Sequence, residues 1–186
     1  MLTGEGAATD GSGAFTVEEL APGRLEVLFL DRAAALMGAS PLVGRAVAVL
    51  AGGETLDLGT IKGWRGEKAD EAQRGTLGWS LASATFEDRP GVESDTSDDK
   101  PSPGVKPLRL WVASMTKGGP AESAGVQLRD EVTLVDGASV ESLGAYPAEM
   151  KLSTGVVTTG QTVELGLSRG GEAVAVTLTA VAAPEE

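Results

Sequence analysis

The stretch Gly118-Gly119-Pro120-Ala121-Glu122-Ser123-Ala124-Gly125 decides the fold of the second half of the chain, because it predicts a short helix between two strands. Pro120 suits the first turn of a helix, the acidic residue two places on lies near the positive helix end, and the last glycine follows the helix. On either side, Leu108–Val112 and Glu131–Val135 alternate in the manner of half-buried strands. This order of elements indicates a mainly β unit.

Two further features extend this unit toward the C-terminus. Thr162–Leu167 and Ala173–Leu178 predict strands that flank Arg169-Gly170-Gly171, a tight hairpin with glycine where a positive φ is needed. Tyr146–Ser153 predicts a second short helix, with apolar residues four apart on one face. We therefore expect a mainly β fold with two short helices.

Five motifs follow one another in the second half of the chain: Thr76-Leu77-Gly78-Trp79, Gly119–Gly125, Leu128–Val132, Val135-Asp136-Gly137 and Gly160–Leu165. On these motifs the chain resembles a PDZ domain over about residues 74–181. Arg129 departs from the family pattern, which usually has glycine there, and a long insertion separates the second strand from the third. The resemblance implies a partly open β-barrel that binds peptides and has no enzymatic activity.

The first of these motifs and the strand after it form the predicted peptide site. A glycine-bearing loop offers successive backbone N–H groups to a carboxylate, and an edge strand offers an unpaired ladder. We expect a peptide to add as an extra strand along Ser80 and Leu81, with its C-terminal carboxylate at the Gly78 loop. The predicted peptide-binding residues are Arg74, Leu77, Gly78, Trp79, Ser80, Leu81, Tyr146 and Met150.

The side chains of this set have distinct expected roles. The pocket for an apolar terminal residue of the peptide is expected among Leu77, Trp79, Leu81 and Met150. Arg74 lies where a basic side chain reaches the carboxylate directly or through water. Tyr146 begins the helix that lines the groove, and we expect it to face the third residue from the end of the peptide.

Simpler interpretations of the same residues stay open. Leu77, Leu81 and Met150 are also compatible with an ordinary core. Trp79 either narrows the pocket or fills it, because this position is usually aliphatic or phenylalanine in the family. Arg74 is equally compatible with a solvated surface charge. Domains of this shape also bind internal segments or act only as spacers.

The first half of the chain resembles a different family. The predicted strands are Phe15–Val17, Arg24–Leu30, Arg45–Leu50 and Thr55–Ile61, with a brief helical pattern at Arg32–Gly38. Thr9–Val17 followed by Leu20–Val27 resembles the carboxypeptidase regulatory-like domain, a transthyretin-like β-sandwich. The resemblance implies an accessory module without peptidase activity. Only eight residues precede Thr9 where that family has about two strands, so we expect a partial sandwich and a fragment of a longer protein.

These features divide the chain into the expected domains. Residues 1–62 form the partial β-sandwich, residues 63–73 a linker and residues 74–183 the PDZ-like domain. Within the last, residues 85–106 are rich in acidic, serine and turn residues. Such a composition cannot bury enough apolar surface to offset ordering, so it predicts a mobile loop.

The composition narrows the chemistry, because the 186 residues include neither His nor Cys. This excludes a Ser-His-Asp triad, a thiol nucleophile, a disulfide and a Cys/His zinc site, and we expect no cofactor or metal. A net charge of −12 disfavours nucleic acid and anionic membrane surfaces. No apolar run is long enough to insert into a membrane, and the first residues lack the pattern of a signal peptide.

The function expected from the sequence is that of a non-enzymatic, two-module protein. Its PDZ-like part captures the C-terminus or an extended segment of another protein. The alternatives are an accessory, substrate-presenting segment of a bacterial envelope protease and a structural surface spacer. The pairing of modules and the Gly-, Ala- and Val-rich composition favour an extracytoplasmic location, in the periplasm, the cell envelope or outside the cell.

Overall fold

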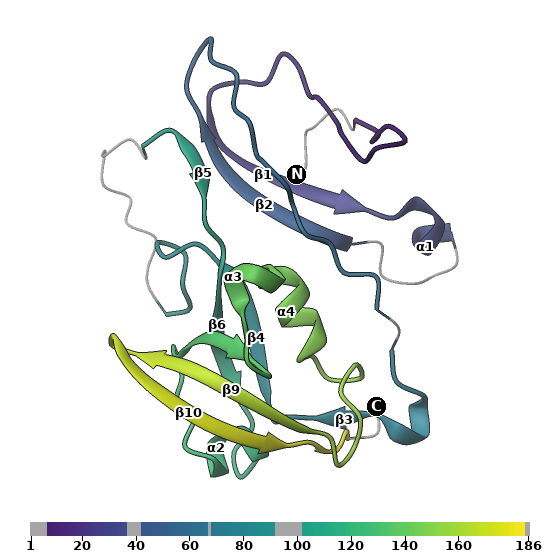
Figure 1. The fold of residues 1–186 in the computed structure, drawn as a ribbon, viewed down its shortest axis with the longest axis vertical. Coiled ribbons are helices and arrows are strands. Elements are labelled where there is room, and N and C mark those ends of the chain that lie inside the picture. Colours follow the sequence, from purple (N-terminus) through teal and green to yellow (C-terminus); the bar gives the residue numbers. More distant parts are fainter. Residues whose placement is uncertain (1–6, 37–41, 67, 92–101, 185–186) are drawn as a thin grey trace.

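The computed structural model describes residues 7–36, 42–66, 68–91 and 102–184. Strands dominate these residues and form three sheets, with short helices between them (Figure 1). Within the described chain the sheets do not close into a barrel. The fold is mainly β and sandwich-like, which confirms the expected fold class.

The first sheet has three antiparallel strands in the order β1-β2-β5. They are β1 (Gly23–Leu30), β2 (Leu42–Leu50) and β5 (Gly104–Lys106), and the short helix α1 (Arg32–Leu36) follows β1. The alternating pattern of residues 24–30 and 45–50 thus predicted two of these strands. Ala46, Val47, Ala48 and Val49 at the centre of β2 are all buried, so both faces of this strand are covered there.

Two other strand predictions in the first half are wrong. Phe15–Val17 and Thr55–Ile61 have no strand structure, although Phe15 packs edge-on against Phe29 of β1 with ring centroids 5.2 Å apart. The second edge of β2 pairs instead with β5, which lies almost sixty residues further along the chain. Because β5 occupies this edge at Val47–Val49, Thr55–Ile61 has no ladder there to join.

The prediction of a mobile loop at residues 85–106 is wrong for both of its ends. Residues 92–101 lie outside the described chain. At one end Asp88 pairs with Arg24 of β1 and with the hydroxyl of buried Thr85. Burial alone would raise the pKa of Asp88, but the hydrogen bonds from Thr85 and Arg24 outweigh it and lower that pKa. At the other end β5 joins the first sheet. The prediction failed because it used the average composition of the whole segment, which does not reveal that its two ends are ordered.

The second sheet has six strands and carries most of the core. Its main path runs β10-β9-β7-β6-β4, and β8 pairs with β7. The strands are β4 (Trp79–Ala84), β6 (Arg109–Met115), β7 (Glu131–Val135), β8 (Ala138–Ser139), β9 (Thr162–Arg169) and β10 (Glu172–Thr179). A separate two-stranded sheet pairs β3 (Gly75–Thr76) with β11 (Val181–Ala182), and a 3-10 turn, η1 (Glu71–Gln73), precedes it.

The helices of this half lie at two places on the second sheet: α3 and α4 pack beside β4, β6 and β7, and α2 packs against β10 (Figure 1). They are α2 (Pro120–Ser123), α3 (Val140–Leu143) and α4 (Ala145–Lys151). Two of them, α2 and α4, match the predicted helices. The described residues hold four α-helices rather than the expected two: α1 lies on the brief helical pattern at Arg32–Gly38, and only α3 was not expected. Ser139 caps α3 by accepting a hydrogen bond from the Ser142 N–H at 3.1 Å.

Arg129 takes a backbone conformation that favours glycine, as its departure from the family pattern suggested. Its φ is +70°, and its guanidinium donates a hydrogen bond to the Gly91 carbonyl at 2.8 Å. Arg129→Gly and Arg129→Ala both remove that bond, but only glycine relieves the left-handed strain. We expect Arg129→Gly to have a free energy of unfolding about 1 kcal/mol above that of Arg129→Ala. Urea denaturation measures this difference, and equal midpoints for the two variants would contradict it.

Candidate functional site

The strand β4 lies at the edge of the second sheet, and helix α4 packs against it (Figure 1). We call the space between them the β4–α4 groove, bounded by residues 79–84 and 145–151. The sequence predicted the peptide site at this place. An edge strand is a site for strand addition only where its outward N–H and C=O groups are unpaired, so their directions decide what the groove can bind.

The loop before β4 is held by helix α2 and by the residue after β6. The Ala121 N–H donates to the Leu77 carbonyl at 3.0 Å, and the Thr116 N–H donates to the Gly78 carbonyl at 2.8 Å. Gly78 has a φ of +73°, and a Cβ atom at this position would lie 2.8 Å from Cδ of Pro120. The loop therefore requires glycine for its own geometry, whether or not it binds a ligand.

The predicted row of open N–H groups in this loop is only partly present. The Gly78 N–H donates to Oγ1 of Thr76 at 3.1 Å, so it already has an acceptor within the chain. The next N–H, that of Trp79, belongs to the same trans peptide unit as the Gly78 carbonyl. Since that carbonyl points toward the residue after β6, the Trp79 N–H points away from β6, toward the open edge.

Leu81 also presents its backbone to the open edge. It lies opposite Val112 in the β4–β6 ladder. The N–H and C=O of Val112 are both occupied on the far side, by the Asp130 carbonyl and the Arg129 N–H at 2.9 Å each. Leu81 and Val112 are therefore a non-hydrogen-bonded pair, and both backbone groups of Leu81 point outward. Among the described residues no group pairs with them on that side.

The same edge is closed two residues further on, at Ser83. The Ser83 N–H donates to a carboxylate oxygen of Glu149 on α4 at 2.8 Å, and the Ser83 carbonyl accepts a hydrogen bond from Nη1 of Arg45 on β2 at 2.8 Å. Only 3% of the Ser83 surface is exposed. Neither Glu149 nor Arg45 was among the predicted residues. Glu149 could have been found, because it precedes the predicted site residue Met150 on the same helix. No feature of the sequence near Arg45 indicated that it would lie at the groove.

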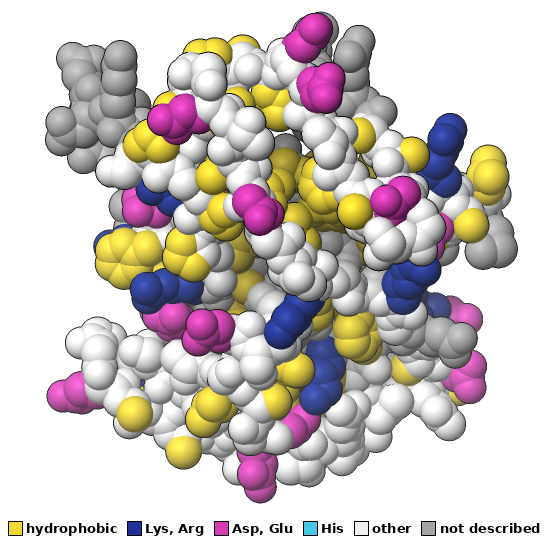
Figure 2. Space-filling view, turned by 45° about the horizontal axis from the view of Figure 1, so that its top comes forward, with side chains coloured by type: hydrophobic (Ala, Val, Ile, Leu, Met, Phe, Trp, Pro, Cys, Tyr) yellow, Lys and Arg dark blue, Asp and Glu magenta, His cyan; other side chains and the backbone are white. Residues whose placement is uncertain are grey.

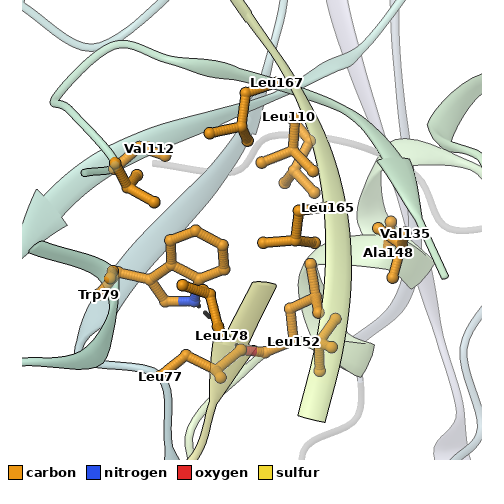
Figure 3. Close-up of a cluster of buried hydrophobic side chains, with 14 of the residues drawn as sticks. Leu77, Trp79, Leu110, Val112, Val135, Ala148, Leu152, Leu165, Leu167 and Leu178 are labelled. Atoms are coloured by element: carbon orange, nitrogen blue, oxygen red, sulfur yellow. Dashed lines mark hydrogen bonds between the residues drawn. The ribbon is translucent and has the colours of Figure 1, made fainter. Parts of the chain in front are cut away.

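The predicted pocket for a terminal side chain is largely filled by core residues. Leu77 and Trp79 are 1% and 8% exposed, and the indole lies among Leu77, Leu152 and Leu178 (Figure 3). The indole N–H points at the Leu152 carbonyl, 3.5 Å away. The core alternative therefore holds for Leu77, and Trp79 fills the pocket rather than narrowing it. Leu81 is partly buried against the same cluster.

The other predicted residues on the groove divide between exposed and half-buried positions. Ser80 is exposed and its hydroxyl bonds to that of Ser114 on β6 at 2.6 Å, so it faces away from the core. Met150 is half-buried on α4. It lies on the helix that forms one wall of the groove, and Leu81 lies on the strand that forms the other.

Tyr146 does not have its predicted role of facing a ligand. It lies in the first turn of α4 as expected, but it is 7% exposed and its hydroxyl donates to the Leu42 carbonyl of β2 at 2.9 Å. Burial raises the pKa of the Tyr146 phenol, and the neighbouring Glu149 carboxylate raises it further. The prediction failed because the first sheet packs against this end of α4, a contact between distant parts of the chain.

Arg74 lies between η1 and β3, beside the loop that holds Gly155. Its backbone forms a bridge with Thr158, and its carbonyl accepts from the Thr159 hydroxyl and the Ala183 N–H. The side chain is half-buried rather than solvated. Its Nε atom is buried and has no hydrogen-bond partner among the described residues, so this cation has an unused donor.

Two cavities border the first sheet rather than the predicted pocket. One, of about 230 Å³, lies between β2, β5 and the α3–α4 turn, and the other, of about 390 Å³, lies beside Phe29 and Ile61. Figure 2 shows hydrophobic side chains inside a hollow of the surface, with Lys and Arg side chains beside it. The first cavity is lined by Arg45 and Tyr146, so it adjoins the closed end of the groove.

Within the described residues, no group of three or more acidic side chains is arranged to hold a metal ion. None of the helices in the same residues has the length and apolar character needed to cross a membrane. Comparison with known proteins gives no matching family model and no matching curated protein.

Proposed function

We propose that the β4–α4 groove binds the C-terminus of another protein by strand addition, in the manner of a PDZ domain and without catalysis. The observation that carries this proposal is the unpaired backbone of the edge strand at Leu81. A sheet edge whose N–H and C=O both point outward, beside a half-buried apolar surface, can pair with an extended peptide. The Trp79 N–H, on the same edge, adds a donor at the end nearest the Gly78 loop.

Two donors favour a free carboxylate over an internal segment. The Trp79 N–H and Nε of Arg74 are both without acceptors among the described residues, and Arg74 lies only five residues before Trp79. The segment that holds Gly155 also reaches the loop, because the hydroxyls of Thr76 and Thr154 are 3.0 Å apart. A carboxylate at the open edge would accept a hydrogen bond from the Trp79 N–H directly, whereas Nε of Arg74 would reach it only after the side chain turns out of its buried position.

The last side chain of the ligand is expected to be small and apolar, such as that of alanine or valine. The indole of Trp79 takes up the volume that a large side chain would need. The surface left beside it is that of Leu81 and Met150. The range of terminal residues that the groove is expected to accept is therefore smaller than the sequence suggested, which was any apolar residue.

The test is a calorimetric titration of the full chain with paired hexapeptides that end in valine, one as the free acid and one amidated. We expect the free acid to bind with micromolar affinity, on the order of −8 kcal/mol, and the amide at least tenfold more weakly. Equal affinities would overturn carboxylate capture. Absence of binding by both peptides would favour a structural spacer.

A pair of variants at Leu81 tests the strand addition itself. Leu81→Pro removes the outward N–H, and the ladder bonds to β6 stay intact because this residue makes none. Leu81→Ala keeps the N–H and serves as the matched control. We expect the proline variant to lose at least tenfold in affinity relative to the alanine variant, with both folded by circular dichroism.

The extracytoplasmic location and the link to an envelope protease are proposals that rest on the sequence resemblances.

A further inference from the structure

The first sheet lies across one end of the β4–α4 groove. The hydroxyl of Tyr146 at the start of α4 donates to the Leu42 carbonyl of β2, and Arg45 of β2 donates to Ser83 near the end of β4. β2 thus contacts both walls of the groove at the same end. The opposite end, at the Gly78 loop, is where the proposed carboxylate binds.

The register of a bound strand follows from these positions. A peptide antiparallel to β4, with its last residue opposite Trp79, has its third residue from the end opposite Leu81 and its fifth opposite Ser83. At Leu81 the backbone N–H and C=O are both unpaired among the described residues. At Ser83 both are already used, by Glu149 and Arg45, and the residue is buried.

We infer that the groove reads only the last three residues of its ligand, and that β2 sets this limit. The inference rests on the proposed function and narrows it to one class of ligand, a free C-terminal tail that bends away from the sheet before its fifth residue from the end. A long extended strand or an internal segment has no path, because it would have to continue through Ser83 and Arg45.

A second contact holds the Arg45 side chain at this end of the groove. Arg45 also contacts the carboxylate of Glu26 on β1 at 2.5 Å, and its side chain is 28% exposed. A ligand that paired with Ser83 would have to displace the Arg45 guanidinium and the Glu149 carboxylate together. Each loses a charge-assisted hydrogen bond in that exchange.

The experiment is a length series of free-acid peptides with a common C-terminus, of three, four, six and eight residues, titrated against the full chain. We expect the affinity to level off at four residues, with less than a twofold gain from four to eight. The Arg45→Ala/Glu149→Ala variant opens Ser83, and there we expect the eight-residue peptide to bind at least threefold more tightly than the four-residue one. Glu141→Ala, the same change in the neighbouring helix, is the matched control and should keep the plateau.

The outcomes separate the length limit from the proposed function. If affinity rises steadily through eight residues in the unaltered chain, the limit set by β2 is wrong and strand addition stands. If no peptide of any length binds, both are wrong. If the double variant fails to fold, the peptide series on the unaltered chain still tests the length limit, because that limit directly predicts the plateau in affinity.

Discussion

Trp79→Ala is expected to lower the free energy of unfolding by about 3–5 kcal/mol. The indole is 8% exposed and belongs to the buried cluster of Figure 3, where it lies beside Leu77 and Leu178. Removing it leaves a cavity that the surrounding leucines cannot fill, because Leu77 lies in the loop before β4, Leu152 just after α4 and Leu178 on β10. Trp79→Phe keeps most of the volume and should cost about half as much or less.

Urea denaturation followed by circular dichroism measures this effect, with Ser80→Ala as the control on the exposed face of the same strand. Ser80→Ala should change stability by less than about 1 kcal/mol, since it removes only one exposed hydroxyl pair. If Trp79 lined an open ligand pocket instead, Trp79→Ala would keep its stability and lose only peptide binding. That result would contradict the placement of the indole in the core.

Asp130→Ala is expected to cost about 3 kcal/mol of stability. Asp130 is 1% exposed and accepts two hydrogen bonds from Arg169, at 2.9 and 2.7 Å, and one from the Gln127 N–H at 2.8 Å. Alanine removes all three and leaves the donors without that acceptor. The expected loss lies at the lower end for a buried pair, because one third of the Arg169 side chain is exposed and water can reach it.

The matched comparison is the exposed pair of Arg109 with Glu131, whose charged atoms are 3.2 Å apart. Glu131→Ala should cost less than about 1 kcal/mol, as is usual for a pair near the surface. Thermal and urea unfolding of the two variants, side by side, measure the contrast. Similar losses of free energy of unfolding in both variants would show that the burial of Asp130 does not increase the contribution of its ion pair to stability.

Features set by neighbouring residues were predictable from the sequence. Arg169-Gly170-Gly171 places two glycines with φ of 59° and 94° in the turn between β9 and β10. Asp136 and Gly137, with φ of 49° and 79°, form the turn between β7 and β8 in the same way. In each case the residues themselves favour the positive φ that a two-residue hairpin needs, so no distant contact has to be known.

Features set by distant contacts were not predictable. The pairing of β2 with β5 joins residues almost sixty apart, and a composition average over the acidic segment concealed it. The same sheet removes Tyr146 from the groove and brings Arg45 to Ser83. The position of the groove therefore followed from local motifs, whereas its closed end depends on how the first sheet packs against α4 and β4.

The most direct test of the proposed strand addition is amide hydrogen exchange at two residues of β4, with and without a short free-acid peptide. In the unliganded chain Leu81 should exchange fast, because its N–H faces the open edge, and Ser83 should be protected by Glu149. Saturating peptide should slow exchange at Leu81 by at least tenfold and leave Ser83 unchanged. A Leu81 amide that is already protected without peptide, or that stays fast with peptide bound, would contradict strand addition at this edge.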